Sequence, residues 1–313
     1  MANPKFGEVA PVLVLFFNRP SHLKSVLDRL VSEGLNDVYF ASDGPRNQAD
    51  EEALDQAWSM VEVAYPKLER SRTLRRKSNL GCRIAVSDAL NWFYSQVASG
   101  IVIEEDCVPS ANFFKILSQG LVKLEANRSV FCINATNPLP GNLRNRKPYL
   151  SVYPQIWGWA TWADRWQFYK RDFSDSSDIV DKVLRRNFSV DSKIRRFYFK
   201  STWRELLKRA GKGEIDTWDY SMLASMWRND LYAVQLTGNY IINNGFEDFA
   251  THTKVRPYWA PRVFSEGQDN SLSGLKTDVE CDRWLSKSVY GCNLPQIMKN
   301  FLKIMLKTMH IKP

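Results

Sequence analysis

Short apolar runs alternate with helical patterns over the first third of the chain. Residues 11–17 (PVLVLFF) form one such run, and apolar side chains then recur three and four apart within residues 21–34, at Leu23, Val26, Leu27 and Leu30. The run is typical of a buried strand, and the spacing is typical of a helix with one face in the core. The pattern therefore predicts a strand–loop–helix unit in this part of the chain.

The same alternation continues as far as residue 106. Further apolar runs or helical patterns occupy residues 37–41 (DVYFA), 50–70, 82–94 and 101–103 (IVI). A β-branched run such as IVI is typical of strands buried on both faces of a parallel sheet. Alternating strands and helices favour right-handed parallel βαβ units. We therefore expect an α/β fold, a Rossmann-like mixed, mostly parallel sheet flanked by helices.

Three carboxylates, Glu104, Glu105 and Asp106, follow the IVI strand directly. Like charges this close repel one another, so the arrangement favours a bound cation or a phosphate-bound metal. Ligands of open α/β sheets bind outside the carboxyl ends of strands, where these acids would lie. A solvated acidic loop is the alternative interpretation. The motif therefore gives a metal-site hypothesis, which the other strand ends can test.

Polar side chains also follow the two earlier strands. Arg19 comes after the first strand, where a guanidinium could meet a nucleobase or a phosphate, and a surface ion pair is the alternative. Asp43 comes after the second strand and could accept a hydrogen bond from a ribose or a base, or serve as a turn residue. Neither G-x-x-x-x-G-K-[ST] nor G-x-G-x-x-G occurs, so we expect a metal to hold phosphate in place of a glycine loop.

A tryptophan-rich stretch lies at residues 157–162 (WGWATW), in a chain with 11 Trp. Trp157, Gly158 and Trp159 are candidates for a sugar site, because an indole offers a flat apolar face and a hydrogen-bond donor. Trp159, Trp162 and Trp166 also have the spacing of one helix face, so a core-packed helix is the competing interpretation.

Residues 170–214 carry 13 Lys and Arg against 7 Asp and Glu and predict helices with charged faces. Such faces are usually solvated, although an acceptor-facing insertion is the other interpretation. Asp219 then stands beside Trp218 at the start of an apolar helix, where Asp is a common N-cap. His252 is placed after a predicted strand within a polar loop, which suits either a structural role or a metal or diphosphate contact.

Composition narrows the classes of partner. The chain has 313 residues, 44% apolar and 25% charged, as in ordinary globular proteins. Its net charge of +9 and pI near 9.2 favour phosphate-bearing partners or an anionic membrane surface. Nucleic acid is not expected as a partner, because stacking platforms for nucleic acid interleave aromatic residues with Lys and Arg. The tryptophan-rich residues 157–162 contain no Lys and no Arg. Five cysteines without a C-x-x-C pattern favour reduced thiols and a cytoplasmic location, without zinc.

The segments after residue 255 differ sharply from each other. Residues 256–292 lack periodicity and are expected to wrap around the body of the protein. In residues 293–313 Lys299, Lys303 and Lys307 recur among apolar residues and no acid occurs, which is typical of a basic amphipathic helix on an anionic bilayer. Docking on the protein's own body is the alternative. Neither a signal peptide nor a membrane span is evident, so we expect a cytoplasmic protein, peripheral at the inner membrane face.

The order of these motifs resembles the inverting GT-A glycosyltransferases, most closely the N-acetylglucosaminyltransferase I-like group. The segments that carry the resemblance are PVLVLFFNRP, DVYFASDG, NLG and IVIEEDCVPSANFF, and it covers roughly residues 10–255. In that group a strand ends in Glu-Asp-Asp and a Phe-Phe pair follows. Here Glu104-Glu105-Asp106 precedes Phe113-Phe114, with Glu in place of Asp at the middle position.

The resemblance implies a role for each candidate residue. Asp106 would coordinate Mn²⁺ or Mg²⁺ on the donor diphosphate, with His252 as a second ligand, while Glu104 and Glu105 would contact the ribose or metal-bound water. Arg19 and Asp43 would flank the nucleobase. The donor sugar and the acceptor would be lined by Trp157, Gly158 and Trp159. The catalytic base would be Asp219, with Asp216 as the alternative.

The resemblance thus implies a metal-dependent glycosyltransferase that moves a sugar from a nucleotide sugar, with UDP favoured, to a glycan or lipid-linked acceptor. A non-catalytic basic protein that binds a membrane, nucleic acid or glycan is the alternative. The expected divisions are a nucleotide-sugar-binding half at 1–140, an acceptor-binding half at 141–255, a wrapping segment at 256–292 and a tail helix at 293–313.

Overall fold

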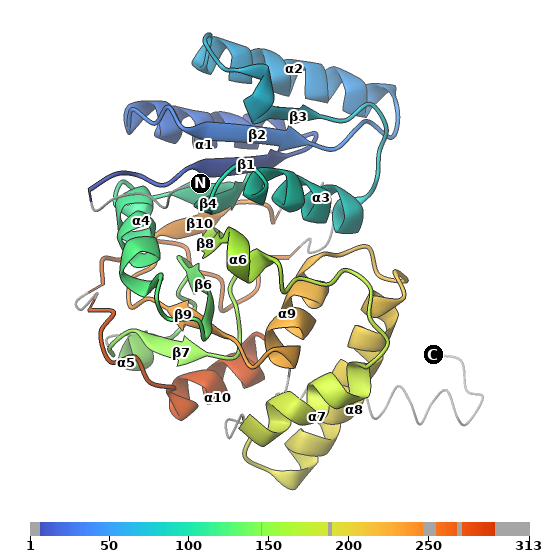
Figure 1. The fold of residues 1–313 in the computed structure, drawn as a ribbon, viewed down its shortest axis with the longest axis vertical. Helices are drawn as coiled ribbons and strands as arrows, with labels where there is room; N and C mark the ends of the chain where they lie inside the picture. The colour runs from blue at the N-terminus through green and yellow to red at the C-terminus, as the bar shows by residue number, and fades with distance from the viewer. Residues whose placement is uncertain (1–6, 145, 187–189, 247–254, 268–270, 292–313) are drawn as a thin grey trace.

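The computed structural model describes residues 7–144, 146–186, 190–246, 255–267 and 271–291 (Figure 1). Its main sheet has eight strands in the order β3-β2-β1-β4-β8-β6-β9-β7, and β5 and β10 form a separate pair. The strands are β1 Val12–Phe16, β2 Val38–Ser42, β3 Thr73–Arg75, β4 Ser99–Glu104, β5 Cys107–Pro109, β6 Val130–Asn134, β7 Tyr149–Ser151, β8 Trp159–Trp162, β9 Tyr232–Gln235 and β10 Ile241–Asn243.

The expected mixed, mostly parallel α/β sheet is confirmed. Strands β3, β2, β1 and β4 pair in parallel, as do β6 and β9. Strand β8 runs antiparallel between β4 and β6, and β7 is antiparallel to β9. All five residues of β1 are buried, as expected for a central strand covered on both faces.

Helices cover both faces of the sheet. They are α1 Pro20–Ser32, α2 Gln48–Ala64, α3 Cys82–Tyr94, α4 Phe113–Leu124, α5 Gly141–Arg144, α6 Ala163–Trp166, α7 Ser176–Arg186, α8 Lys193–Gly211, α9 Asp219–Arg228 and α10 Val279–Ser288, with a 3₁₀ turn at Arg70–Arg72. Alternate β1 residues point to opposite faces: Val12 and Val14 pack with α1, α2 and α4, whereas Leu13 and Leu15 pack with α3 and α9.

A third apolar cluster lies beside the sheet. Helices α7, α8, α9 and α10 build it around large side chains that include Phe199, Trp203 and Trp227. Helices α7 and α8 form the end of the molecule opposite α2 (Figure 1). Helices α7 and α8 therefore lie within residues 170–214 as expected, and both bury an apolar side against α9.

Two local expectations are wrong. Helix α2 ends at Ala64 rather than near residue 70, because Pro66 disfavours helical backbone at the residue before it. Residues 159–162 form strand β8 rather than a helix; they lie between β4 and β6, are buried throughout and show no alternation that would mark a strand. The segment 256–292 lacks an obvious helical pattern but contains helix α10, whose first turn is capped by the Asp278 side chain; that the segment wraps around the body stays a prediction.

The predicted tail helix at 293–313 lies outside the described residues. Within the described part of the chain, no helix is both long and apolar enough to cross a membrane. The four cysteines found there, Cys82, Cys107, Cys132 and Cys281, are free thiols.

Candidate active site

Arg19 binds two of the three acids that follow β4. Its Nε lies 2.6 Å from Glu105 Oε1, and its Nη2 lies 3.0 Å from Asp106 Oδ2. The Phe17 backbone N–H donates to Glu105 Oε2 at 2.5 Å. Burial opposes the charge on Arg19, but Glu105, Asp106 and Glu104 outweigh it and raise the Arg19 pKa. The ends of β1 and β4 are therefore joined by a buried ion-pair network, and the nucleobase contact of Arg19 stays a prediction.

Glu104 is placed differently from its two neighbours. Its side chain is half-buried, and no donor from the described residues hydrogen-bonds to its carboxylate. Burial first, and then the charges of Asp106, Glu105 and Asp219, raise its pKa to about 8, although Arg19 opposes this. Asp219, at the start of α9, is thus close enough to repel Glu104. The carboxyl end of β4 and the start of α9 therefore bring the carboxylates of Glu104 and Asp219 to the same edge of the sheet.

The loop after β10 covers Asp106. Strand β10 pairs with β5 so that Asn243 lies opposite Cys107, and the Asn244 N–H donates to the Asp106 carbonyl at 2.8 Å. A Cβ on Gly245 would lie 2.1 Å from Asp106 Oδ2 and 3.1 Å from Arg19 Nη1. Only a residue without a side chain fits here. The sequence prediction missed Gly245, and its signal was the Asn-Asn-Gly turn that follows a strand.

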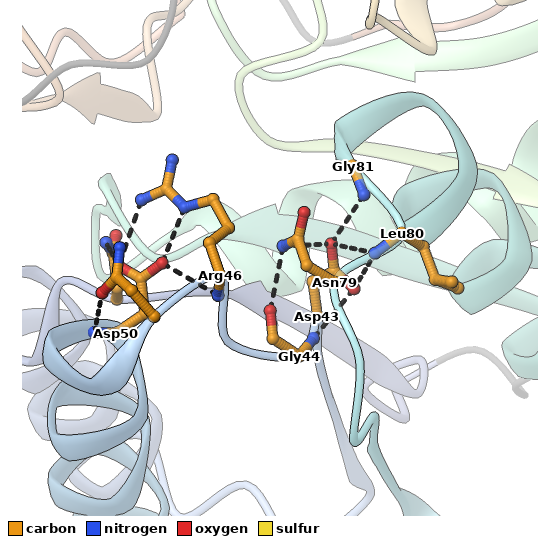
Figure 2. A network of polar contacts seen from close by, with 9 residues as sticks. Asp43, Gly44, Arg46, Asp50, Asn79, Leu80 and Gly81 are labelled. Carbon is orange, nitrogen blue, oxygen red and sulfur yellow. Dashed lines mark hydrogen bonds and ion pairs between the residues drawn. The ribbon is translucent and has the colours of Figure 1, made fainter.

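Asp43 organises the loop that leads into α3 (Figure 2). Its carboxylate accepts from the Leu80 N–H at 3.0 Å, the Gly81 N–H at 3.0 Å and Asn79 Nδ2 at 2.9 Å. Nearby, Arg46 Nε donates to Asp50 at 2.6 Å, and hydrogen bonds led by that one lower the Asp50 pKa to about 2. Asp43 has the turn role that the sequence offered as its alternative, and its contact with a ribose or base stays a prediction.

Asp216 and Asp219 have separate roles. Asp216 accepts from the Cys82 N–H at 3.0 Å and the Arg83 N–H at 2.8 Å, so it caps the first turn of α3 from far along the chain. Asp219 is the first residue of α9, and its Oδ1 accepts from the Thr217 hydroxyl and from the Tyr220 N–H at 2.8 Å. Asp219 therefore remains the candidate base, whereas Asp216 caps α3; the choice between them stays a prediction.

Trp157 and Trp159 lie in different environments. Trp159 is 1% exposed and stacks on Trp218 with ring centroids 5.8 Å apart, so it has no face for a sugar ring and is a core residue. Trp157 is half-buried and stacks on Trp259 at 5.2 Å. Gly158 has a φ of +65°, and a Cβ there would meet Ile241 Cδ1 at 2.5 Å. Glycine is thus required between the two rings.

Glu104, Glu105 and Asp106 have the charge and the oxygen ligands that a divalent cation needs, but they do not supply enough ligands by themselves. When all three are ionised, Arg19 balances one charge and two remain. Oxygen ligands of this kind suit Mg²⁺ or Mn²⁺. Among the described residues, no three His, Cys, Asp or Glu side chains are arranged to hold a metal by themselves, and His252 lies outside those residues. A cation held here would need ligands from a bound donor as well as from Glu104 or Asp106.

Two of the hollows in the surface of the described residues have different surroundings. One of about 370 Å³ is lined by Ser21, His22, Ser25, Val108, Asn244, Phe246 and Arg256, and the Asn244 N–H donates to the Asp106 carbonyl. The other, about 670 Å³, lies at the opposite edge of the sheet near the start of β2, where its lining includes Asp37, Tyr65 and Arg72. The smaller hollow therefore lies beside the loop that covers Asp106, although no candidate acid lines it.

Comparison with known proteins adds little to this geometry. No protein-family model and no curated protein matches the sequence. One similar solved structure is a UDP-glucose pyrophosphorylase complexed with UDP-glucose, with 8% identity over 51% of this chain and 78% of the other and a TM-score of 0.27. Another is a mannose-1-phosphate geranyltransferase from Thermus thermophilus, with 12% identity over 75% of both chains and a TM-score of 0.33. Both TM-scores are low, so the fold rests on the strand order described above.

Proposed function

We propose that this protein is a metal-dependent inverting glycosyltransferase that uses a nucleoside-diphosphate sugar, with UDP favoured as the nucleotide. The observation that carries the proposal is the convergence of Glu104 and Asp106 with Asp219 at the carboxyl edge of a mostly parallel sheet. Ligands of open α/β sheets bind at this edge. Such a reaction needs carboxylates for two tasks, one facing a cation and one facing an acceptor hydroxyl, and this edge supplies both.

Asp219 is suited to the role of base. Two hydrogen bonds to Oδ1, from Thr217 and from the Tyr220 N–H, fix the orientation of its half-buried carboxylate. It would take the proton of the acceptor hydroxyl while that oxygen attacks the anomeric carbon from the face opposite the departing nucleoside diphosphate. The C–O bond to the diphosphate breaks as the new glycosidic bond forms, which inverts the anomeric configuration.

The acids after β4 are suited to the donor. Glu104 and Asp106 would hold a divalent cation, which when bound supplies a Lewis acid for the charge on the leaving diphosphate. Glu105 serves this arrangement indirectly, because its two oxygens hold Arg19 and the Phe17 N–H. Arg19 in turn holds the Asp106 carboxylate in place through an ion pair of 3.0 Å. The identity of the donor nucleobase and of its sugar, and the contact of Asp43 with the ribose or nucleobase, are parts of the same proposal.

The test separates the two tasks. UDP binding is measured by calorimetry with and without Mn²⁺, and transfer or hydrolysis is measured with UDP-, GDP- and dTDP-sugars. Asp219→Asn is expected to bind UDP and Mn²⁺ like the parent protein but to transfer sugar roughly 10²–10⁴-fold more slowly, the usual contribution of a general base. Asp106→Asn is expected to lose the Mn²⁺-dependent part of UDP binding. Asp28→Asn, in an exposed ion pair with Lys24, is the matched control.

Full transfer activity in Asp219→Asn, or transfer that chelation leaves unchanged, would contradict this mechanism. If every nucleotide sugar fails to bind with or without Mn²⁺, the chain is not a transferase of this kind. Binding of saccharides alone would then favour the non-catalytic alternative.

A further inference from the structure

Three aromatic side chains from separate segments meet beside the acids. Trp157 stacks on Trp259, with centroids 5.2 Å apart and ring planes 18° apart, and it packs edge-on against Phe246 at 5.4 Å. All three side chains are only half-buried, unlike the fully buried Trp159 and Trp162. The neighbouring Tyr258 is 78% exposed. These rings therefore form a partly open aromatic cluster rather than part of the core.

The aromatic cluster of Trp157, Phe246 and Trp259 adjoins the proposed metal site. Phe246 follows Gly245, whose backbone lies against the Asp106 carboxylate. Phe246 also lines the hollow of about 370 Å³, together with Asn244 and Arg256. A molecule lying against the aromatic cluster would thus lie beside a donor bound at the proposed metal site.

Positive charge accompanies the aromatic cluster. The guanidinium carbon of Arg256 lies 4.8 Å from the centre of the Phe246 ring, and Nη1 donates to the Pro261 carbonyl at 3.3 Å. Burial and the nearby charge of Arg262 both lower the Arg256 pKa. Within the described residues, neither arginine has a carboxylate partner, whereas Arg46, Arg83 and many other arginines are ion-paired. Two adjacent cations with no carboxylate partner in the described part of the chain favour an anionic ligand.

We propose that this cluster is the acceptor subsite and that the acceptor is an acidic saccharide. Its C–H face would stack on the apolar face of Trp259 that Trp157 does not cover. Its carboxylate or phosphate would pair with Arg256 and Arg262 in charge-assisted hydrogen bonds. The assignment as acceptor rests on the proposed function, but the binding of an acidic saccharide does not depend on it.

Tryptophan fluorescence titrations with matched saccharides test the inference. The probes are cellobiose, cellobiouronic acid, glucose and glucose 6-phosphate, so that carboxylate and phosphate are compared separately with neutral sugars. We expect at least one acidic probe to bind at least five-fold more tightly than its neutral counterpart. Arg256→Gln should remove that preference and leave the affinity for the neutral sugar unchanged.

Substitution of Trp259 provides a second test of the inference. Trp259→Ala should weaken binding of acidic and neutral saccharides alike at least five-fold, while Trp259→Phe, which keeps an aromatic face, should retain most of it. Phe168→Ala, at an exposed aromatic residue that is 42% accessible, is the matched control. UDP binding with Mn²⁺ should be unchanged in both Trp259 variants and in Phe168→Ala.

Equal affinity for acidic and neutral saccharides, or no greater loss in Trp259→Ala than in Phe168→Ala, would overturn the inference. Retention of the acidic preference in Arg256→Gln would do the same. Acidic saccharide binding without turnover of any nucleotide sugar would remove the proposed transfer and leave the subsite standing.

Discussion

At the scale of single residues, Gly245 determines whether Asp106 can keep its position. The Asp106 carboxylate pairs with Arg19 at 3.0 Å, and the Gly245 backbone fills the space next to it. The contact arises because β10 pairs with β5, two strands more than a hundred residues apart in the chain. A sequence pattern can place the acids at the end of a strand, but it cannot show which distant backbone will close over them.

Gly245→Ala is therefore expected to weaken Mn²⁺-dependent UDP binding at least ten-fold. The new Cβ would lie 2.1 Å from Asp106 Oδ2, so that either the carboxylate must leave Arg19 or the loop must move. Calorimetry with UDP and Mn²⁺ measures the effect, and circular dichroism checks the fold. Gly141→Ala is the control, because a Cβ there has no neighbour within 4 Å. Equal UDP affinities in the two variants would show that Asp106 does not need this position.

At the scale of elements, strongly patterned segments were predictable, whereas three of the short strands were not. The sequence placed α3 at its observed bounds and β1, β2, β4 and α1 within two residues, because long apolar runs and helical spacing are strong signals. Strands β3, β5 and β7 have three residues each, too few to show a pattern. Helix α10 was missed because surrounding Pro and Gly residues suggested irregular structure.

The cap that Asp216 supplies to α3 is another feature that spacing cannot reveal. Asp216→Ala should lower the free energy of unfolding by about 1 kcal/mol, the usual contribution of a helix cap, because the Cys82 and Arg83 N–H groups lose their acceptor. Urea denaturation measures this difference. Asp219→Asn is the matched comparison and should remove transfer with little loss of stability. The reverse pattern would exchange the roles of the two aspartates.

Helix α10 docks on the sheet through a buried carboxylate with a shifted pKa. Asp282 is 4% exposed, and its Oδ1 accepts from the Ser151 hydroxyl at 2.5 Å. Burial raises the Asp282 pKa to about 7, against about 4 in an unfolded chain. The folded state therefore binds this proton more tightly, so its contribution to stability is present below pH 4 and is lost as the pH rises to about 7.

Asp282→Asn should therefore flatten the pH dependence of stability between pH 5 and pH 8. The parent protein should lose on the order of 1–3 kcal/mol more than the variant over this range, because the charged carboxylate is buried in the parent protein only. Urea denaturation at the two pH values gives the difference. Asp50, whose pKa is about 2, stays ionised throughout and does not interfere. Parallel pH profiles for the two proteins would show that Asp282 titrates normally.

At the scale of the whole molecule, the two expected halves share one sheet. Strand β8, from the later half, lies between β4 and β6 of the earlier half, and β9 extends the sheet beyond β6. The acids after β4 and the start of α9 come from opposite sides of the expected boundary at residue 140. The candidate site therefore depends on both halves folding together, which a reading of successive βαβ units did not show.

The distribution of charge along the whole chain leads to a prediction about residues 293–313. This segment carries four lysines and no acid, so it supplies four of the nine net positive charges. Removal of residues 293–313 is expected to abolish co-sedimentation with vesicles that contain anionic lipid and to leave the melting temperature of the remaining chain unchanged. Neutral vesicles serve as the lipid control.

Replacing Lys299, Lys303 and Lys307 with Gln separates charge from apolar contact. Each lysine near an anionic surface contributes roughly 1 kcal/mol, so the triple variant should bind on the order of 10²-fold more weakly. Salt should weaken the parent protein in the same way, because it screens exposed charges. Unchanged vesicle binding in the triple variant would rule out an electrostatic membrane contact. A marked fall in melting temperature on truncation would instead mean that the segment packs on the protein's own body, as the alternative interpretation holds.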